Sequence, residues 1–154
     1  FPSSRYCSSV DVQIASLCDY AADYNGKLCI QGAFDTILVQ HLPAVHMSCS
    51  VALRIVFRDT DTGEHTMKLA MIDEDGKDQL PEHMPKPKLN IALADNMFFA
   101  TNNYVFNLQG LKFPTAGQYS IDISIDDKII ARIPLQVIQV QSTQHPLQPP
   151  PQGT

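Results

Sequence analysis

One stretch decides the fold: Asn107-Leu-Gln-Gly-Leu-Lys-Phe-Pro-Thr-Ala-Gly-Gln-Tyr-Ser-Ile-Asp-Ile-Ser-Ile-Asp-Asp127. It predicts the end of a strand, a corner, a long strand and a tight turn. From Tyr119 onward, apolar and polar residues alternate, so Tyr119 and the isoleucines after it face one side and the polar residues face the other. This period of two is typical of a half-buried antiparallel strand.

The corner within this stretch reads Phe113-Pro114-x-x-Gly117-x-Tyr119. Pro114 ends one segment, Gly117 permits a tight turn, and Tyr119 begins the next strand with its ring directed inward. We expect the Tyr119 hydroxyl to bond backbone across the corner, as in the tyrosine corners of β-sandwiches. Pro114, Gly117 and Tyr119 are therefore assigned a structural role.

The same alternation recurs along the chain, separated by turn residues and without a convincing helix. It predicts about eight strands in a domain over residues 10–140, flanked by an N-terminal arm (1–9) and a Pro/Gln-rich tail (141–154). Even spacing and Gly/Pro corners favour an all-β fold of two packed antiparallel sheets, an immunoglobulin-like or C2-like sandwich. A closed barrel is the alternative, because alternation alone does not distinguish closure from stacking.

The longest predicted strand covers residues 46–58, and a turn separates it from a strand over residues 64–72. We expect these two strands to form a hairpin. The face of the first strand that runs from Met47 through Cys49 to Phe57 is predicted to be buried, and the other face mostly solvated. Residues 129–140 predict one or two shorter strands around Pro134, since proline cannot donate to a ladder.

The chain of 154 residues carries a formal net charge of −5, and its 11 basic residues are scattered. Nucleic acid and anionic membranes both require clustered Lys and Arg, so neither is expected as a partner. No apolar run is long enough to span a membrane, and no signal peptide is recognisable. We expect a soluble, cytoplasmic protein, although the start at Phe1 without methionine leaves a removed leader open.

The four cysteines have spacings that match neither a zinc site nor a redox pair. Cys49 and Cys18 lie in phase with apolar neighbours, which predicts small buried hydrophobes. Free thiols are the main expectation. A bridge between Cys18 and Cys29, a bridge from Cys7, and a metal site stay open as alternatives.

Several short motifs punctuate the predicted strands. They are Leu17-Cys-Asp-Tyr-Ala21, Gly26-Lys-Leu, Ile30-x-Gly-x-Phe-Asp35, Pro43-Ala44, Leu53-Arg54, Gly63-Glu-His65 and Asn107-Leu-Gln-Gly-Leu-x-Phe-Pro-x-x-Gly-x-Tyr119. Over residues 12–140 this pattern resembles a family of small bacterial β-sandwich proteins of unknown function. The resemblance implies a bacterial, intracellular sandwich with no known cofactor and no assigned catalytic residues. The two flanking tails fall outside it.

Two acidic clusters are candidate calcium sites, because C2-type sandwiches hold calcium between carboxylate-bearing loops. They lie at opposite ends of the predicted strand over residues 64–72, so they cannot combine, and neither has the full calcium-loop pattern. Solvated turn carboxylates are the main expectation, and a weak calcium site stays open. The clusters are Asp59, Asp61 and Glu64, and Asp73, Glu74, Asp75 and Asp78.

No pattern compels an enzyme. His41, His46 and His65 lack the spacing of a zinc site, and His65 shares its phase with apolar neighbours, which predicts a partly buried, hydrogen-bonded ring. There is no Gly-x-Ser-x-Gly motif, and the glycines never cluster into a phosphate-binding loop. We therefore expect no catalytic residue, no metal and no cofactor.

The segment from Asn96 to Tyr104 is the main candidate for binding. Met97, Phe98 and Phe99 are consecutive, so they cannot all face one core. Core packing is the preferred interpretation. If one of them is exposed beside Tyr104, these four residues mark a partner surface.

These observations favour a non-catalytic binding or assembly module that acts through its surface or an edge strand. Its expected partner is another protein or a second copy, with homodimerisation by edge-strand pairing as the specific form. A small-molecule or calcium-binding sandwich is the alternative, followed by a hydrolase.

Overall fold

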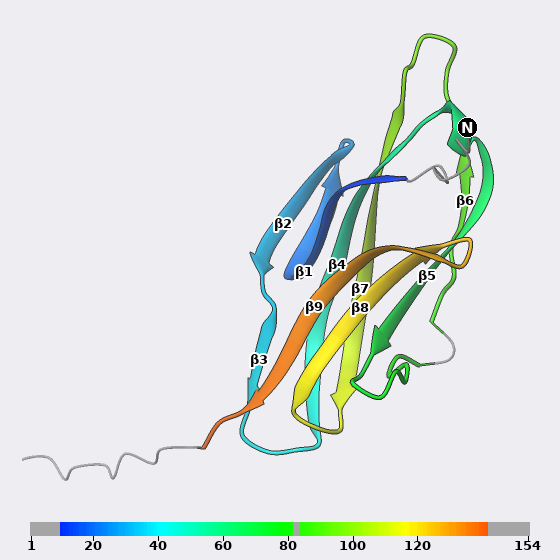
Figure 1. The fold of residues 1–154 in the computed structure, drawn as a ribbon. Coiled ribbons are helices and arrows are strands. Elements are labelled where there is room, and N and C mark those ends of the chain that lie inside the picture. The colour runs from blue at the N-terminus through cyan, green and yellow to red at the C-terminus, as the bar shows by residue number, and fades with distance from the viewer. Residues whose placement is uncertain (1–9, 82–83, 142–154) are drawn as a thin grey trace, which may run out of the picture.

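Two β-sheets face each other in the computed structural model, which describes residues 10–81 and 84–141 (Figure 1). The four-stranded sheet has the order β2-β1-β4-β7, and the five-stranded sheet has the order β3-β9-β8-β5-β6. The predicted all-β sandwich is confirmed, with nine strands among the described residues. They are β1 (Asp11–Tyr24), β2 (Lys27–Ala33), β3 (Thr36–Val39), β4 (Ala44–Phe57), β5 (Gly63–Ile72), β6 (Lys88–Ile91), β7 (Ala100–Phe113), β8 (Gly117–Ile125) and β9 (Lys128–Gln139).

The core fills the space between the sheets and follows the alternation of the strands. In β8 every second residue from Tyr119 to Ile125 is buried, as the sequence predicts. Facing residues of β4 and β5 complete the core, among them Leu53, Phe57 and Met67. The predicted arm (1–9) and all but the first residue of the predicted tail (141–154) lie outside the described residues.

β4 and β5 do not form the predicted hairpin. β4 pairs with β1 and β7, while β5 pairs with β6 and β8 in the other sheet. The chain crosses between the sheets through a short 3-10 helix, η2 (Asp59–Asp61), which the buried Asp61 carboxylate closes by accepting the Arg58 N–H at 2.8 Å. The turn residues were recognised correctly, but they serve a crossing rather than a reversal.

Both faces of β4 are buried over much of its length, so the predicted solvated face is wrong. Ser50, Ala52 and Val56 on that face are covered as fully as the inner residues. The cover comes from β1. Ile14 of β1 pairs with Arg54 of β4. The Arg54 guanidinium also donates to the carbonyl of Gly26, twelve residues after Ile14, at 3.1 Å.

Twelve residues of extended strand would span about 40 Å, so β1 must fold back across β4 to bring Gly26 to Arg54. The β1–β2 hairpin thereby covers the outer face of the four-stranded sheet and creates a second small apolar cluster there. Side chains of β4 and β7 hold the tip of the hairpin by hydrogen bonds, an arrangement that we call the hairpin latch. Its residues are Gln13, Asp23, Gly26, Arg54 and Asn103.

Met47 was predicted to be buried, but its side chain is 75% exposed. The buried positions of the neighbouring strand β7 change phase between Leu108 and Leu111, across Gly110 with a φ of 63°. In β4, which pairs with this part of β7, the alternation of buried and exposed residues also shifts. The alternation that buries Cys49 therefore does not continue to Met47. A period-two pattern cannot reveal such a change, because it assumes one phase throughout a strand.

β9 is one continuous strand rather than two short ones, although it contains Pro134. Pro134 lies opposite Ser120 of β8, and β3 pairs with β9 only from Gln136 onward. At Pro134 the other side of β9 is therefore a local sheet edge, where a missing N–H costs no ladder bond. β3 runs parallel to β9, so the expectation of purely antiparallel sheets is also corrected.

Candidate functional site

Met97, Phe98 and Phe99 all lie on the surface, in the loop that connects β6 to β7. Their exposed fractions are 46%, 91% and 48%, so the preferred interpretation as core residues is wrong. Leu93, at the start of the loop, still packs against the core, after which the chain leaves it. Figure 1 shows this loop projecting beyond the ends of the neighbouring strands. We call these three residues the β6–β7 tip.

Tyr104, the fourth residue of the predicted surface, lies within β7 and is half-buried. Its hydroxyl accepts a hydrogen bond from Asn102 Nδ2 at 3.0 Å, and burial raises the pKa of its phenol. Tyr104 lines an open groove of about 440 Å³ between β7 and the proline-rich segment before β6, which we call the edge groove. The groove is lined by Met84, Pro85, Pro87, Asn103, Tyr104, Val105, Phe106 and Asn107.

β7 is the edge strand of the four-stranded sheet. It has 14 residues, whereas the other edge strands β2, β3 and β6 have 7, 4 and 4. Lys112 is the one charged residue of β7. Among the described residues, the backbone of β7 pairs with β4 alone. Proteins protect sheet edges with short strands, charges or prolines. β7 has a single lysine as such protection within the strand, and the segment with Met84, Pro85 and Pro87 lies alongside its residues 103–107.

Of the three residues of the predicted corner, Tyr119 is buried, Gly117 is half-buried and Pro114 is exposed. The buried Tyr119 donates its hydroxyl to the Thr115 carbonyl at 2.7 Å, and its ring meets Phe113 edge-on with the centroids 5.2 Å apart. Gly117 has a φ of 145°, and a Cβ there would lie 2.8 Å from Glu74 Oε1. The corner, including Pro114, follows the C-terminal end of β7, whereas the β6–β7 tip precedes its N-terminal end.

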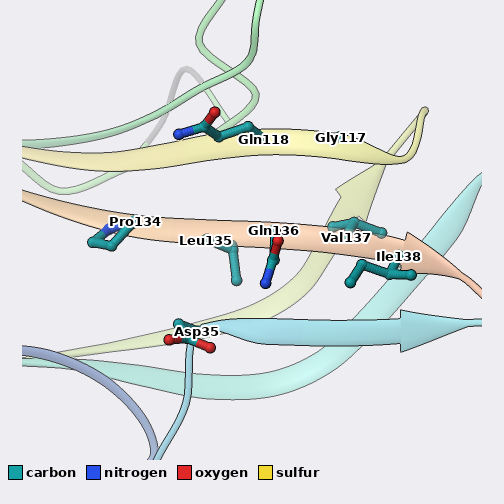
Figure 2. Close-up of a pocket in the computed structure, with 8 residues that line it drawn as sticks. All are labelled: Asp35, Gly117, Gln118, Pro134, Leu135, Gln136, Val137 and Ile138. Atoms are coloured by element: carbon teal, nitrogen blue, oxygen red, sulfur yellow. The ribbon is translucent and has the colours of Figure 1, made fainter.

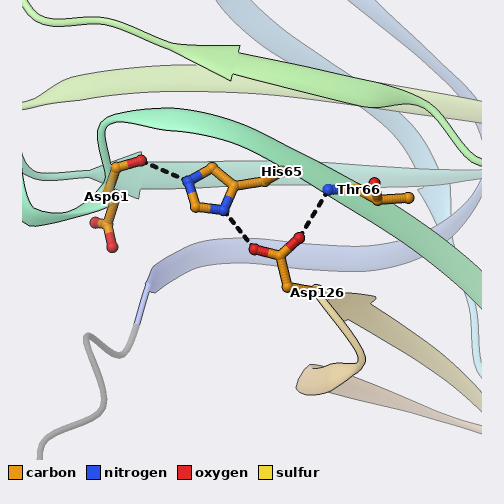
Figure 3. A network of polar contacts seen from close by, with 4 residues as sticks. All are labelled: Asp61, His65, Thr66 and Asp126. Carbon is orange, nitrogen blue, oxygen red and sulfur yellow. Dashed lines mark hydrogen bonds and ion pairs between the residues drawn. The ribbon is translucent and has the colours of Figure 1, made fainter.

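His65 is part of a polar network that joins β5, η2 and the turn between β8 and β9 (Figure 3). Its Nδ1 lies 2.5 Å from Asp126 Oδ2, and its Nε2 lies 2.6 Å from the Asp61 carbonyl oxygen. The second oxygen of Asp126 accepts the Thr66 N–H at 2.9 Å. The predicted partly buried, hydrogen-bonded His65 is thus confirmed, and its partners come from η2 and the β8–β9 turn.

This network favours a doubly protonated imidazole. A carbonyl and a carboxylate can only accept hydrogen bonds, so both ring nitrogens of His65 must donate. The hydrogen bond to Asp126 is the main cause that raises the pKa of His65, and the backbone N–H of Thr66 is the main cause that lowers the pKa of Asp126. An imidazole with both nitrogens donating cannot accept a proton from a nucleophile.

A second cavity, of about 510 Å³, lies on the outer face of the five-stranded sheet. Figure 2 shows its residues on β8 and β9 and, just before β3, at Asp35. Asp35 is the one ionisable side chain among the described residues that line it, and Gln136 across from it already donates to the Thr36 hydroxyl at 2.9 Å. The cavity lacks the convergent ionisable groups that a catalytic site requires.

Asp61 and Asp73, one from each acidic cluster, stabilise their own turns. Asp73 accepts the backbone N–H groups of Asp75 and Lys77, each at 2.9 Å, and the Gln79 amide at 2.6 Å. Asp61 is occupied by closing η2. Within residues 10–81 and 84–141, no three His, Cys, Asp or Glu side chains converge as metal ligands.

The described cysteines are free thiols: Cys18 and Cys49 are buried, and Cys29 is exposed. Burial raises the pKa of Cys49 to about 11, which makes it an inert core residue. Cys7, the fourth cysteine, lies outside the described residues. Neither a bridge between Cys18 and Cys29 nor a reactive core thiol is present in the described part.

A family model for proteins of unknown function, DUF6941, matches residues 13–138. The chain belongs to the DUF6941 family. No match was found among curated proteins. In the described part of this DUF6941 protein, no helix has the length and apolar character needed to cross a membrane.

Sequence reasoning selected the residues of the β6–β7 tip and Tyr104 but missed the other wall of the edge groove. Met84, Pro85 and Pro87 were assigned to a loop because prolines cannot join a sheet interior. Nothing local in that segment indicates that it lies against β7. The signal that was available is the run of uncharged residues in β7, which is unusual for an edge strand.

Proposed function

We propose that this DUF6941 protein is a non-catalytic protein-binding module that docks through the β6–β7 tip and the edge groove. The observation that carries the proposal is the exposure of three consecutive large apolar side chains, with Phe98 91% exposed. Fully burying one phenylalanine is worth roughly 1.5–3 kcal/mol. A partner surface that covers the tip recovers this free energy.

The charges near this surface favour a protein partner. Asp95 is the one charged residue in the loop, Lys112 is the one in β7, and Lys86 lies between the groove residues Pro85 and Pro87. An anionic membrane or a nucleic acid would need a cluster of basic residues here. An apolar surface framed by asparagines instead matches the composition of protein interfaces, where charged residues are depleted at the centre.

The shape of the surface favours an extended partner segment. Among the described residues the backbone of β7 pairs with β4 alone, and the edge groove places apolar side chains along its other side. Extended chains bind such edges by adding a strand, with backbone hydrogen bonds for affinity and pockets for specificity. The tip then contacts the partner beyond the end of the added strand.

The polar sites of the molecule support a role without catalysis. The nitrogens of His65 are both engaged as donors, and the carboxylate of Asp73 is occupied by three donors. Cys49 is buried with a raised pKa.

A small-molecule site is the alternative, because a pocket of about 410 Å³ is lined by Asp73, Glu74, Asp122 and Arg132. Its charged groups already have partners within the chain: Arg132 lies 3.8 Å from Asp122, and Glu74 accepts the Gln118 N–H at 2.9 Å.

Affinity capture from the native cell tests this function. Immobilised wild-type protein should retain a partner that can be identified by mass spectrometry and rebound in purified form. Phe98→Ser should lose that partner, because it removes the most exposed aromatic ring of the tip. Tyr20→Ser is the matched control, since Tyr20 is an exposed aromatic residue on β1 away from the tip. Equal retention by both variants would contradict the proposal.

A further inference from the structure

We infer that the partner at this surface is a second copy of the same chain, with the two β7 strands paired antiparallel about a two-fold axis. This inference rests on the proposed function, because it uses the same β6–β7 tip and edge groove. It adds the identity of the partner and a second apolar patch, on β4, that the tip contacts.

The second patch lies at the other end of β7. Val45 and Met47, on the first residues of β4, are 55% and 75% exposed. Val45 pairs with Lys112 near the C-terminal end of β7, whereas the β6–β7 tip directly precedes Ala100 at its N-terminal end. We call Val45 and Met47 the sheet-end patch. One chain thus has an exposed apolar group at each end of its edge strand.

Two-fold symmetry brings these unlike groups together. In an antiparallel pair, the N-terminal end of one β7 lies beside the C-terminal end of the other. The tip of each copy then reaches the sheet-end patch of its partner, about two strand spacings of ~4.8 Å away. The contact occurs twice, as an isologous interface requires.

The middle of β7 also suits a second copy. Tyr104 and Phe106 pack against the core but are only half-buried, because in the described part of the chain no further strand lies beside β7 on that edge. An axis near Val105 places Tyr104 of one copy opposite Phe106 of the second copy. Aromatic cross-strand pairs of this kind stabilise antiparallel sheets. Lys112, the one charge in the strand, meets no like charge in this register.

The size of the contact agrees with a stable dimer. With the axis near Val105, residues 100–110 of the two strands overlap over about 36 Å, and pairing two such edges of ~10 Å thickness buries roughly 700 Å² in total. Covering Phe98 and Phe99 of both copies adds roughly 600 Å², at ~150 Å² for each ring. The sum lies within the range of about 1,200–2,000 Å² for stable interfaces.

Sedimentation velocity of the full chain at micromolar to high micromolar concentration tests the inference. The wild-type chain should sediment as a dimer. Phe98→Asp and Met47→Asp should each raise the dimer dissociation constant at least about tenfold, since each places a charge in an apolar contact. Both residues are exposed in the single chain, so both variants should fold. Leu38→Asp is the control, because Leu38 is 63% exposed on the edge strand β3.

Amide hydrogen exchange of the wild-type chain provides a second measurement that needs no variant. Protection of residues 100–113 should increase with protein concentration, while β3 shows no such change. A monomeric wild type at high micromolar concentration overturns the inference, and so does a dimer that resists both Phe98→Asp and Met47→Asp. If the chain is monomeric but still loses a captured partner through Phe98→Ser, the proposed function stands and the self-pairing fails.

Discussion

Tyr119 shows how one side chain closes a corner of the sandwich. Its ring is buried against Phe113, and its hydroxyl donates to the Thr115 carbonyl at 2.7 Å. Tyr119→Phe should cost about 1 kcal/mol, the net value of one hydrogen bond. Tyr119→Ala should cost about 3 kcal/mol or more, because it also leaves a cavity. Denaturant unfolding measures both, and a loss below about 1 kcal/mol for Tyr119→Ala would contradict the structural role.

His65 makes the stability depend on pH in a defined direction. Its pKa is raised in the folded chain, so its contribution is fully present below about pH 6.5, the ordinary value, and is lost as the pH rises through the raised value. The pKa of Asp126 is lowered, so its contribution is present above about pH 4 and is lost in more acidic solution. The contact between His65 and Asp126 therefore stabilises the fold most between about pH 4 and about pH 6.5.

Thermal unfolding across neutral pH tests this behaviour. The wild-type melting temperature should fall as the pH is raised from about 6 to 8.5, and His65→Gln should flatten that part of the profile. Asp126 is half exposed, so the change is screened by solvent and should be modest. His41→Gln, at an exposed histidine, is the control and should keep the wild-type profile. An unchanged profile in His65→Gln would argue against the paired imidazolium.

The β1–β2 hairpin is an element whose position depends on the hairpin latch. Asn103 connects three strands: its Nδ2 donates to Asp23 at 2.9 Å and to Gly26 at 3.1 Å, and its Oδ1 accepts from Arg54 at 2.8 Å. The latch therefore ties the hairpin tip to both β4 and β7. The tip itself is a turn with positive φ at Asn25 and Gly26, two residue types that accept this conformation readily.

Removing Asn103 should loosen this hairpin without unfolding the sandwich. In Asn103→Ala, amide exchange over residues 19–31 should become roughly fivefold faster, corresponding to about 1 kcal/mol of lost hydrogen bonding. Exchange in β8 should stay unchanged. Asn102→Ala, which removes only a bond to the Tyr104 hydroxyl, is the neighbouring control. Equal acceleration in both variants would show that the latch does not hold the hairpin.

Some elements were predictable because their signal is local. The alternation after Tyr119 and the turn at Asn25-Gly26 depend on neighbouring residues only. The assignment of β4 and β5 to different sheets was not predictable, because the residues around Asp59 would suit a hairpin or a crossing equally well. Which one forms depends on β1 and β7, the strands that take both sides of β4.

The candidate surface was predictable in composition but not in position. Three consecutive apolar residues at Met97–Phe99 indicated that not all could be buried, yet their common exposure depends on how the loop leaves the core after Leu93. The edge groove depends on where the segment from Met84 to Pro87 lies against β7. That placement is a tertiary contact, which periodicity and turn residues do not encode.

At the level of the whole molecule, self-pairing through β7 would couple stability to concentration. The melting temperature of the wild type should rise with protein concentration, because dimerisation stabilises the folded state by mass action. Phe98→Asp should remove this dependence while leaving the melting temperature of the dilute protein within the small range typical of surface substitutions. Leu38→Asp should retain it. A wild-type melting temperature that is independent of concentration would contradict the dimer.

The parallel pair of β3 and β9 has a consequence for biosynthesis. Thr36 pairs with Gln136, so 100 residues must be synthesised after β3 before its partner leaves the ribosome. At translation rates of roughly 5–20 residues per second, β3 waits on the order of 5–20 s without its partner strand. With four residues, β3 presents little backbone for unwanted pairing on the nascent chain during that interval.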